Sequence, residues 1–227
     1  TFKNSKAGFE KLSKWVKKLN PVLELTILME ATGVYHESLA CYLDDKGFYV
    51  SVVLPNKASH FSKTLNLKTI NDKVSSQNLA IMGLEKKLDR WKKPLALYNN
   101  LRQLTRERDQ LIQERTQIKC QLHAEISGAW PHQASIKRMK QRIKMINAQK
   151  TDIETELKAV VESNEELSRK MKYVCTIKSV GLITAATVIG ETNGFNLVRN
   201  KNQVVSYAGL DVKEHTSGTS VHKQARI

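Results

Sequence analysis

The stretches LELTILM, residues 23–29, and YVSVVL, residues 49–54, decide the fold of the N-terminal part of the chain. Both are short, largely apolar runs; the first lies behind Pro21 and the second is stopped by Pro55. A short apolar run with β-branched residues that is bounded by proline is typical of a buried β-strand, whereas a buried helix needs a longer pattern. Each stretch is therefore predicted to be a buried strand.

Helical patterns alternate with these two strands. One predicts an amphipathic helix over about residues 5–20, and a second begins near Tyr35 and ends at Gly47. The order helix, strand, helix, strand favours an α/β domain with parallel strands. Because two strands make a poor sheet, we expect further strands upstream of the first residue. The apolar residues of the first helical pattern are Phe9, Leu12, Trp15, Val16 and Leu19.

The middle of the chain, residues 94–172, has a different period. Apolar residues recur at heptad spacing before and after a break at residues 127–131, and Arg108 and Arg115 fill intervening positions of the seam. Two helices of about thirty residues joined by a Gly/Pro turn predict either an antiparallel hairpin or a dimeric coiled coil. The basic residues on these helices are either a solvated face or a surface for phosphates. The seam residues are Leu97, Leu101, Leu104, Leu111, Ile118, Leu122, Ile136, Met139, Ile143, Ile146, Ile153, Leu157 and Val160.

The last part of the chain, residues 173–227, is rich in small residues. Residues 180–189, VGLITAATVI, predict a turn followed by a closely packed helix. The turn KSVG at residues 178–181 is similar to that of a helix–hairpin–helix, which grips a phosphate backbone, but lacks one glycine. A plain helical hairpin within a core is the alternative. The polar stretch HTSGTS at residues 215–220 is predicted to be a loop.

Composition limits the function classes. The 227 residues include 37 Lys and Arg against 22 Asp and Glu, which gives a net charge of +15 and predicts a polyanionic partner, foremost nucleic acid. With 41% hydrophobic residues and no apolar run of about 18, the chain is predicted to be neither disordered nor membrane-spanning. Three scattered cysteines show neither a disulfide framework nor a zinc signature, which favours the cytoplasm.

Two carboxylates are candidates for chemistry. Glu30 follows the apolar run of residues 27–29, and the carboxyl end of a buried strand is where open α/β sheets place their ligands. Asp72 precedes a second helical stretch. Carboxylates from two elements can share a divalent metal ion and a phosphodiester. The alternatives are a turn or capping carboxylate for Glu30 and a helix N-cap for Asp72.

Ser217 is the third candidate. A serine that is followed by glycine in a polar segment can serve as a nucleophile toward phosphorus. His215 is close in sequence, but no Ser/His/Asp set that would make a hydrolase triad is legible. An ordinary loop serine is the alternative.

Several motifs, taken in order along the chain, resemble those of the DEDD insertion-sequence transposases, a group related to the Piv/MooV DNA invertases. In the N-terminal half the similar stretches are MEATGVYH at residues 29–36, VVLP at 52–55 and Asp72-Lys73. In the C-terminal half they are GLITAA at residues 181–186, YAGLD at 207–211 and SGTS at 217–220. Each motif is weak alone, but their shared order along nearly the whole chain makes the resemblance specific.

The resemblance implies an α/β plus α architecture in three parts. Residues 1–93 would form a RuvC-like, RNase H-type domain that carries an Asp-Glu-Asp-Asp set. Residues 94–172 would form a coiled-coil insertion that joins protomers, and residues 173–227 a small helical transposase domain with a nucleophilic serine. Glu30 matches the glutamate of the set, Asp72 its third acidic residue and Ser217 the nucleophile, with Ser220 as the second choice.

Two departures from the family pattern concern the metal site. The first aspartate of the set is expected on a strand upstream of Thr1, and the fourth position is occupied by Ser75 rather than aspartate. A serine hydroxyl is a neutral and weaker ligand, so the set Glu30, Asp72 and Ser75 carries one negative charge fewer. Either Gln77 or a water compensates, or the metal is bound more weakly, or the element is inactive.

The resemblance implies a DNA recombinase that depends on Mg²⁺ or Mn²⁺, with Glu30, Asp72 and Ser217 as catalytic residues. Its expected partners are DNA, a structured non-coding guide RNA, and further copies of the chain in a dimer or tetramer; no membrane partner is expected. Two other classes stay open. One is a RuvC-like nuclease that cuts with metal-activated water alone, and the other is a degenerate transposase that binds nucleic acid without cutting it.

Overall fold

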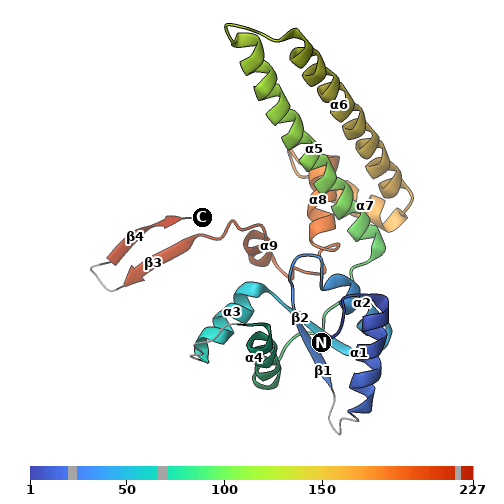
Figure 1. Cartoon of the computed structure of the whole chain (residues 1–227), viewed down its shortest axis with the longest axis vertical. Coiled ribbons are helices and arrows are strands. Elements are labelled where there is room, and N and C mark those ends of the chain that lie inside the picture. Colours follow the sequence, from blue (N-terminus) through green and yellow to red (C-terminus); the bar gives the residue numbers. More distant parts are fainter. Residues whose placement is uncertain (20–24, 66–70, 218–220, 227) are drawn as a thin grey trace. The chain divides into compact units, whose positions relative to one another are not determined.

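The computed structural model describes residues 1–19, 25–65, 71–217 and 221–226. The chain divides into two compact units, Thr1–Lys93 and Pro94–Ile227. Figure 1 shows the elements of both units. The assignment of separate roles to residues 1–93, 94–172 and 173–227 stays a prediction.

The N-terminal unit confirms the predicted alternation of helices and strands. The two strands pair in parallel, from Thr26 opposite Tyr49 to Glu30 opposite Val53. The first strand begins later than predicted, and part of the predicted range lies outside the described residues. The elements are α1 (Lys6–Lys18), β1 (Thr26–Glu30), α2 (Glu37–Asp45), β2 (Tyr49–Val53), α3 (Pro55–Thr64) and α4 (Asp72–Glu85).

Helices cover both faces of the β1–β2 pair. On one face, Leu28 and Val53 pack against Phe61 of α3 and Met82 of α4. On the other face, strand residues of opposite parity pack against α2 in a second cluster. Because side chains alternate along a strand, Glu30 lies on the same face as Leu28, toward α3 and α4. The layered α/β arrangement thus decides which helices surround this carboxylate.

The chain returns to β2 after α4. The backbone N–H of Trp91 donates to the Val50 carbonyl at 2.7 Å. The Ser51 hydroxyl, 1% exposed, donates to the carbonyl of Asp89 at 3.0 Å. These bonds satisfy polar groups next to the buried strand and hold the end of the unit against it.

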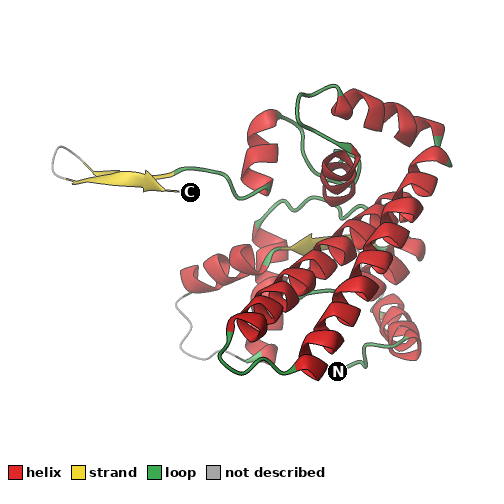
Figure 2. Ribbon diagram, turned by 90° about the horizontal axis from the view of Figure 1, so that it is seen from above, coloured by secondary structure: helices red, strands yellow, loops and turns green. Residues whose placement is uncertain are grey.

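The second unit is mainly helical. Its two longest helices run side by side in both views (Figures 1 and 2). The turn between them covers the predicted break. The elements are α5 (Ala96–Ser127), α6 (Gln133–Glu162), α7 (Glu165–Cys175), α8 (Leu182–Glu191), α9 (Lys201–Tyr207), β3 (Lys213–Ser217) and β4 (Val221–Arg226).

Helices α5 and α6 form the antiparallel hairpin, the first of the two alternatives that the heptad pattern left open. Arg108 donates to Glu154 at 2.8 Å, and Arg115 donates to the Asn147 side chain at 3.1 Å. From Arg108 to Arg115 the chain advances seven residues along α5, and from Glu154 to Asn147 it goes back seven residues along α6, so both contacts follow one antiparallel register. Most of the predicted seam is buried, including Leu101, Leu104, Ile118, Ile136, Ile146, Ile153 and Leu157.

Helices α7 and α8 pack against one end of this hairpin in a single hydrophobic cluster. The prediction of a turn and a closely packed helix at residues 180–189 is confirmed, since Ala185, Ala186 and Ile189 of α8 are fully buried. Small residues let α8 approach α5 closely: a Cβ at Gly190 would lie 2.9 Å from the Arg102 backbone nitrogen. We call this end of the hairpin, residues 96–114 of α5 and 152–162 of α6, the hairpin base.

The prediction of a loop at residues 215–220 is wrong for its described part. Residues 213–217 form β3, which pairs antiparallel with β4, and Ser217 stands opposite Val221. The C-terminal part therefore contains a β-hairpin as well as helices. The strand was missed because KEHTS has no alternation of apolar and polar residues, which is the signal that identifies a half-buried strand.

Within the described residues, no helix has the length and apolar character that a membrane span requires.

Candidate functional site

A cavity of about 380 Å³ lies beside the carboxyl end of β1, between α3 and α4. Glu30 is the last residue of β1 and lines this cavity. Its apolar wall belongs to the cluster that packs α3 and α4 on the sheet. The polar residues that line the cavity are Glu30, Ser59, Ser62, Lys63, Ser75 and Asn78.

The end of β1 places Glu30 at the cavity. The Ala31 N–H donates to the carbonyl of Val53 at 2.8 Å, so the strand pairing continues to the residue that follows Glu30. The chain then turns at Gly33, whose φ of 51° lies in the left-handed region that favours glycine. The position is the one expected from the sequence, at the carboxyl end of a parallel strand.

Helix α3 supplies one polar wall. Pro55 occupies the first turn, where its missing N–H has no helical partner to lose, and so starts the helix directly after β2. Ser59, Ser62 and Lys63 then follow at helical spacing and line the cavity together. Lys63 brings a cation to the same cavity as the Glu30 carboxylate.

Helix α4 supplies the opposite wall. Asn71, not Asp72, is its N-cap: the Asn71 side chain accepts a hydrogen bond from the Val74 N–H at 2.9 Å. Asp72 is the first helical residue and is exposed, and Ser75 lines the cavity one turn further along. Residues three apart share a helix face, so Asp72 lies on the face of Ser75, one turn nearer the helix start.

Asn78 is a cavity residue that the sequence analysis missed. Its side chain is 7% exposed, and its Nδ2 donates to the hydroxyl of Ser62 at 3.2 Å, which links α4 to α3. The signal that would have found it is the three-residue spacing from Asp72 through Ser75 to Asn78. Gln77, named above as a possible compensating ligand, is exposed on α4 and does not line the cavity.

The side chains that line the cavity offer oxygen atoms as possible metal ligands, and their charges nearly cancel. Glu30 is the only acidic residue among its described lining residues, and Lys63 opposes its charge. In the parts of the chain that the structure describes, no three His, Cys, Asp or Glu residues cluster closely enough to hold a metal ion. The structure therefore brings Glu30 and Ser75 together, with Asp72 outside the cavity lining.

The candidate nucleophile belongs to the other unit. Ser217 is the last residue of β3, within Pro94–Ile227, whereas Glu30, Asp72 and Ser75 belong to Thr1–Lys93. Ser220, the second choice, lies outside the described residues.

Comparison with known proteins identifies the family of the chain. The sequence model of the IS110 transposases with a DEDD set, described as "Transposase", matches residues 1–131. A second one, "Transposase IS116/IS110/IS902 family", matches residues 171–227. The pilin gene-inverting proteins of Moraxella lacunata and Moraxella bovis are 28% and 27% identical, over the whole of this chain and 69% of their own length. The first match covers more than half of the chain, and the chain therefore belongs to the IS110 family of transposases.

Proposed function

We propose that the protein cuts and rejoins DNA through a covalent phosphoserine intermediate on Ser217, with a divalent metal ion bound at the Glu30 cavity. The observation that carries the metal site is the shared cavity of Glu30 and Ser75 at the carboxyl end of β1. Membership of a transposase family supports DNA as the substrate. The parallel strands with helices on both faces are consistent with the RuvC-like, RNase H-type domain that the resemblance implies.

The residues of the cavity fit a small hard cation. Mg²⁺ prefers oxygen ligands and is commonly held by one or two carboxylates together with the phosphates of the substrate. Glu30 would supply one carboxylate, Ser75 and Asn78 neutral oxygens, and Asp72 a second carboxylate from the first turn of α4. A divalent ion at this place supplies positive charge to a DNA phosphate, and Mn²⁺ has the same ligand preference.

The side chains of the protein perform the remaining steps. Lys63 pairs with a phosphate oxygen and orients the phosphodiester. The Ser217 hydroxyl gives up its proton to water, and its Oγ forms a bond to phosphorus. The bond from phosphorus to the adjoining nucleotide oxygen breaks, and that oxygen takes up a proton. The hydroxyl of a second DNA strand then gives up its proton to water and attacks phosphorus; the bond from phosphorus to Oγ breaks, and Oγ takes up a proton. One phosphodiester replaces another, so bond energy is conserved during strand exchange.

Ser75 lowers the expected affinity for the metal ion. With serine at the fourth position of the set, the cavity has a single carboxylate and Lys63 in its lining. Replacement of Ser75 by aspartate would restore the missing charge near the start of α4, where the helix dipole favours an anion. We expect Ser75→Asp to shift the half-saturating Mg²⁺ concentration for cleavage downward. If neither protein cleaves DNA in Mg²⁺ or Mn²⁺, the degenerate binder is the better description.

The partners follow from the same proposal. The net charge of +15 favours extensive contact with phosphates. Strand exchange between two DNA molecules needs several active sites, so we propose a dimer or tetramer formed through the α5–α6 hairpin. The proposal of a structured guide RNA as a partner rests on the family resemblance. Sequencing of the RNA that copurifies through high salt tests it: one defined species from beside the reading frame is expected, and random fragments would contradict guidance.

The decisive test compares the Ser217→Ala variant with the unchanged protein. Both are full-length, and both act on supercoiled DNA that carries the native element ends. We expect the unchanged protein to form an adduct that resists sodium dodecyl sulfate, and Ser217→Ala to form none. Ser38→Ala, an exposed serine on α2, is the matched control and should keep the adduct. Glu30→Ala and Asp72→Ala should lose cleavage altogether. Cleavage that persists without an adduct in Ser217→Ala would identify the metal-only nuclease instead.

A further inference from the structure

The α5–α6 hairpin has opposite charge at its two ends. We call residues 115–151, which include the turn, the hairpin tip. The tip contains eight Lys and Arg residues and one acidic residue, Glu125, whereas the hairpin base contains four basic and seven acidic residues. The net charge therefore changes from −3 at the base to +7 at the tip along one continuous pair of helices. Solvation of a helix face alone does not require opposite charges at the two ends of the hairpin.

Six of the eight cations of the tip are exposed and form no ion pair with a described residue. The other two are half-buried: Lys150 pairs with Glu154 at 3.0 Å, and Arg115 donates to the Asn147 side chain. Five of the exposed cations lie within eight residues at the start of α6: Lys137, Arg138, Lys140, Arg142 and Lys144. All five are exposed, and none forms an ion pair with any described residue. At the base, by contrast, Arg108 pairs with Glu154 at 2.8 Å and Arg106 with Glu191 at 2.6 Å. Arg106 and Arg108 of the base thus form ion pairs within the protein, whereas these five cations of the tip are available to a ligand.

Helical geometry gathers these cations on the outer surface. Ile136 and Ile146 are buried against α5, so the opposite side of α6 faces solvent. Lys137, Lys140 and Lys144 have the spacing i, i+3, i+7 and share one face, and Arg138 and Arg142 form a second row beside it. Two tips brought together would repel each other, which argues against a second tip as the occupant of this surface; a dimer formed through the hairpin would use other parts of it. A polyanion fits.

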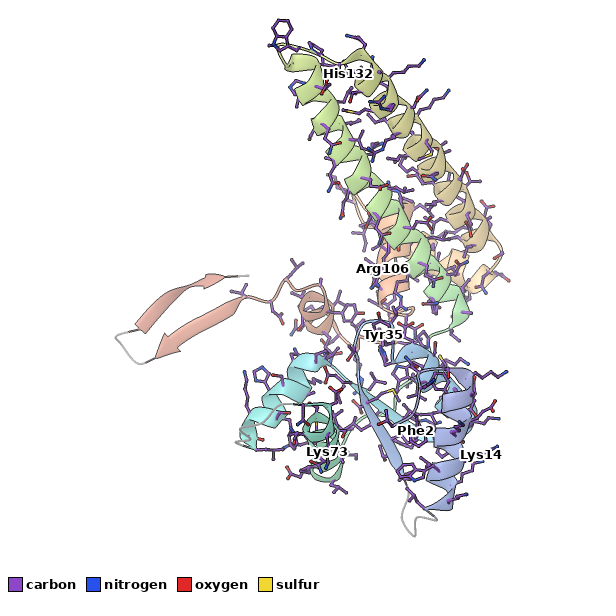
Figure 3. The ribbon with its side chains drawn as sticks, viewed as in Figure 1. Phe2, Lys14, Tyr35, Lys73, Arg106 and His132 are labelled. Atoms are coloured by element: carbon purple, nitrogen blue, oxygen red, sulfur yellow. The ribbon has the colours of Figure 1, made fainter. Side chains whose placement is uncertain are left out.

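The turn at the end of the tip exposes an aromatic ring. Trp130 is 91% exposed between the two helices, so it contributes nothing to packing. The turn itself is held in place: the backbone N–H of His132 donates to Glu125 at 2.7 Å, and His132 Nδ1 accepts from the Ser135 N–H at 3.2 Å. Figure 3 shows His132 at this turn. The only carboxylate of the tip is thus engaged in the turn and does not neutralise the cations.

We propose that the hairpin tip binds unpaired nucleotides of DNA, with the two basic rows on the phosphates and the Trp130 indole stacked on a base. Exposed aromatic rings beside a basic surface are typical of single-strand binding, because the face of a base is accessible only when the base is unstacked. DNA is the substrate class of the transposase family. The choice of DNA as the ligand rests on the proposed function. The tip site itself contains neither the residues of the Glu30 cavity nor Ser217.

Binding of the full-length protein to a fluorescent 20-nucleotide single strand tests the basic rows. The triple variant Lys137→Gln, Lys140→Gln, Lys144→Gln should weaken binding at least tenfold in 0.1 M salt. It should also reduce the slope of log K against log salt by about 2, since each lost phosphate contact on a single strand contributes about 0.7. The matched control neutralises Lys11, Lys14 and Lys18, which are exposed on α1 with the same spacing, and should change binding less than twofold.

Trp130 is tested with three ligands of one sequence: single-stranded DNA, duplex DNA and an RNA hairpin whose loop has that sequence. Trp130→Ala should weaken single-strand binding about 5- to 150-fold, because stacking contributes about 1–3 kcal/mol per base. Duplex binding should not change, and Trp130→Phe should restore most of the affinity. Equal losses with the α1 control, or no effect of Trp130→Ala, would overturn the proposal. A larger tip-dependent affinity for the RNA loop would assign the surface to RNA instead.

The outcomes separate this proposal from the proposed function. Ser217→Ala and Glu30→Gln should bind the single strand as tightly as the unchanged protein. If they do, and the unchanged protein forms no adduct with DNA, the proposed function fails while the tip site stands. If the adduct forms with wild-type yield in the lysine triple variant and single-strand binding is unchanged, the tip site fails alone.

Discussion

The base and the tip of the α5–α6 hairpin share one heptad pattern, but they differ in the helices that pack against them and in the charge of their surfaces. At the base, the seam joins α7 and α8 in a common core, and Leu101, Leu157 and Leu167 are at most 1% exposed. At the tip, the seam holds only two helices together, and the remaining surface is basic and exposed. Apolar periodicity therefore indicates where helices pack. The distribution of charge along the helices distinguishes the end that stabilises the fold from the end that we propose binds a ligand.

The largest expected effect is on the core of the base. Leu157→Ala removes a fully buried side chain from the cluster that joins α6 to α7 and α8. We expect a loss of about 2–5 kcal/mol in the free energy of unfolding, measured by urea with the helical circular dichroism signal. Met145→Ala on the same helix is the control, since Met145 is 56% exposed at the tip and should cost less than about 0.5 kcal/mol. Equal losses would erase the distinction between the two ends.

The close approach of α8 to α5 gives the second prediction. A methyl group at Gly190 would lie 2.9 Å from the backbone nitrogen of Arg102, so Gly190→Ala must push the two helices apart. The expected loss is about 1–3 kcal/mol, in the same unfolding experiment. Gly181→Ala, where a Cβ meets nothing within 4 Å, is the matched control. An unchanged stability of Gly190→Ala would mean that α8 does not pack on α5 as described.

The ion pair of the base predicts a pH dependence. The hydrogen bond from Arg108, followed by that from Lys150, holds the pKa of Glu154 below its ordinary value of 4.5. A lowered folded pKa gives stability that is present above about pH 4.5 and is lost as the pH falls through the folded pKa. Glu154→Gln should therefore cost about 1 kcal/mol at pH 7 and progressively less below pH 4.5. A difference between the two proteins that is constant from pH 3 to 7 would contradict this assignment.

The smallest effect is expected at the tip. The lysine triple variant at positions 137, 140 and 144 removes exposed cations that have no described ion pair, and it reduces repulsion among like charges. Its free energy of unfolding should stay within about 0.5 kcal/mol of the unchanged protein or rise slightly. A loss above about 1 kcal/mol would show that these lysines serve the fold rather than a ligand.

The sequence predicted best those elements whose apolar residues form a short continuous run or recur at regular spacing. The short apolar runs around Ile27 and Val50 became β1 and β2, and the heptad seam became the antiparallel hairpin. The helix at residues 6–18 was also predicted, but Trp15 and Leu19 of its apolar pattern are about half exposed. Periodicity identifies a helix and its preferred face, but it does not tell how far the neighbouring element extends to cover that face.

The sequence predicted less where residues are polar and act through tertiary position. Asn78 enters the cavity because α4 packs on α3; the three-residue spacing from Asp72 through Ser75 places it on the same helix face, but the spacing alone does not show that this face meets α3. Asp72 was a candidate N-cap, but Asn71 caps α4 and leaves Asp72 at the first helical position. The strand that ends at Ser217 carries no apolar alternation, so the backbone pairing with β4 alone defines it.

The central claim, that Ser217 forms the covalent bond to DNA, is tested most directly by locating the adduct. The full-length protein is trapped on its DNA in Mg²⁺, digested with nuclease and protease, and analysed by peptide mass spectrometry. We predict a nucleotide phosphate on Ser217 in the peptide that contains residues 217–220. A nucleotide on Ser220 or on any other residue, or cleaved DNA with no modified peptide, would contradict the claim.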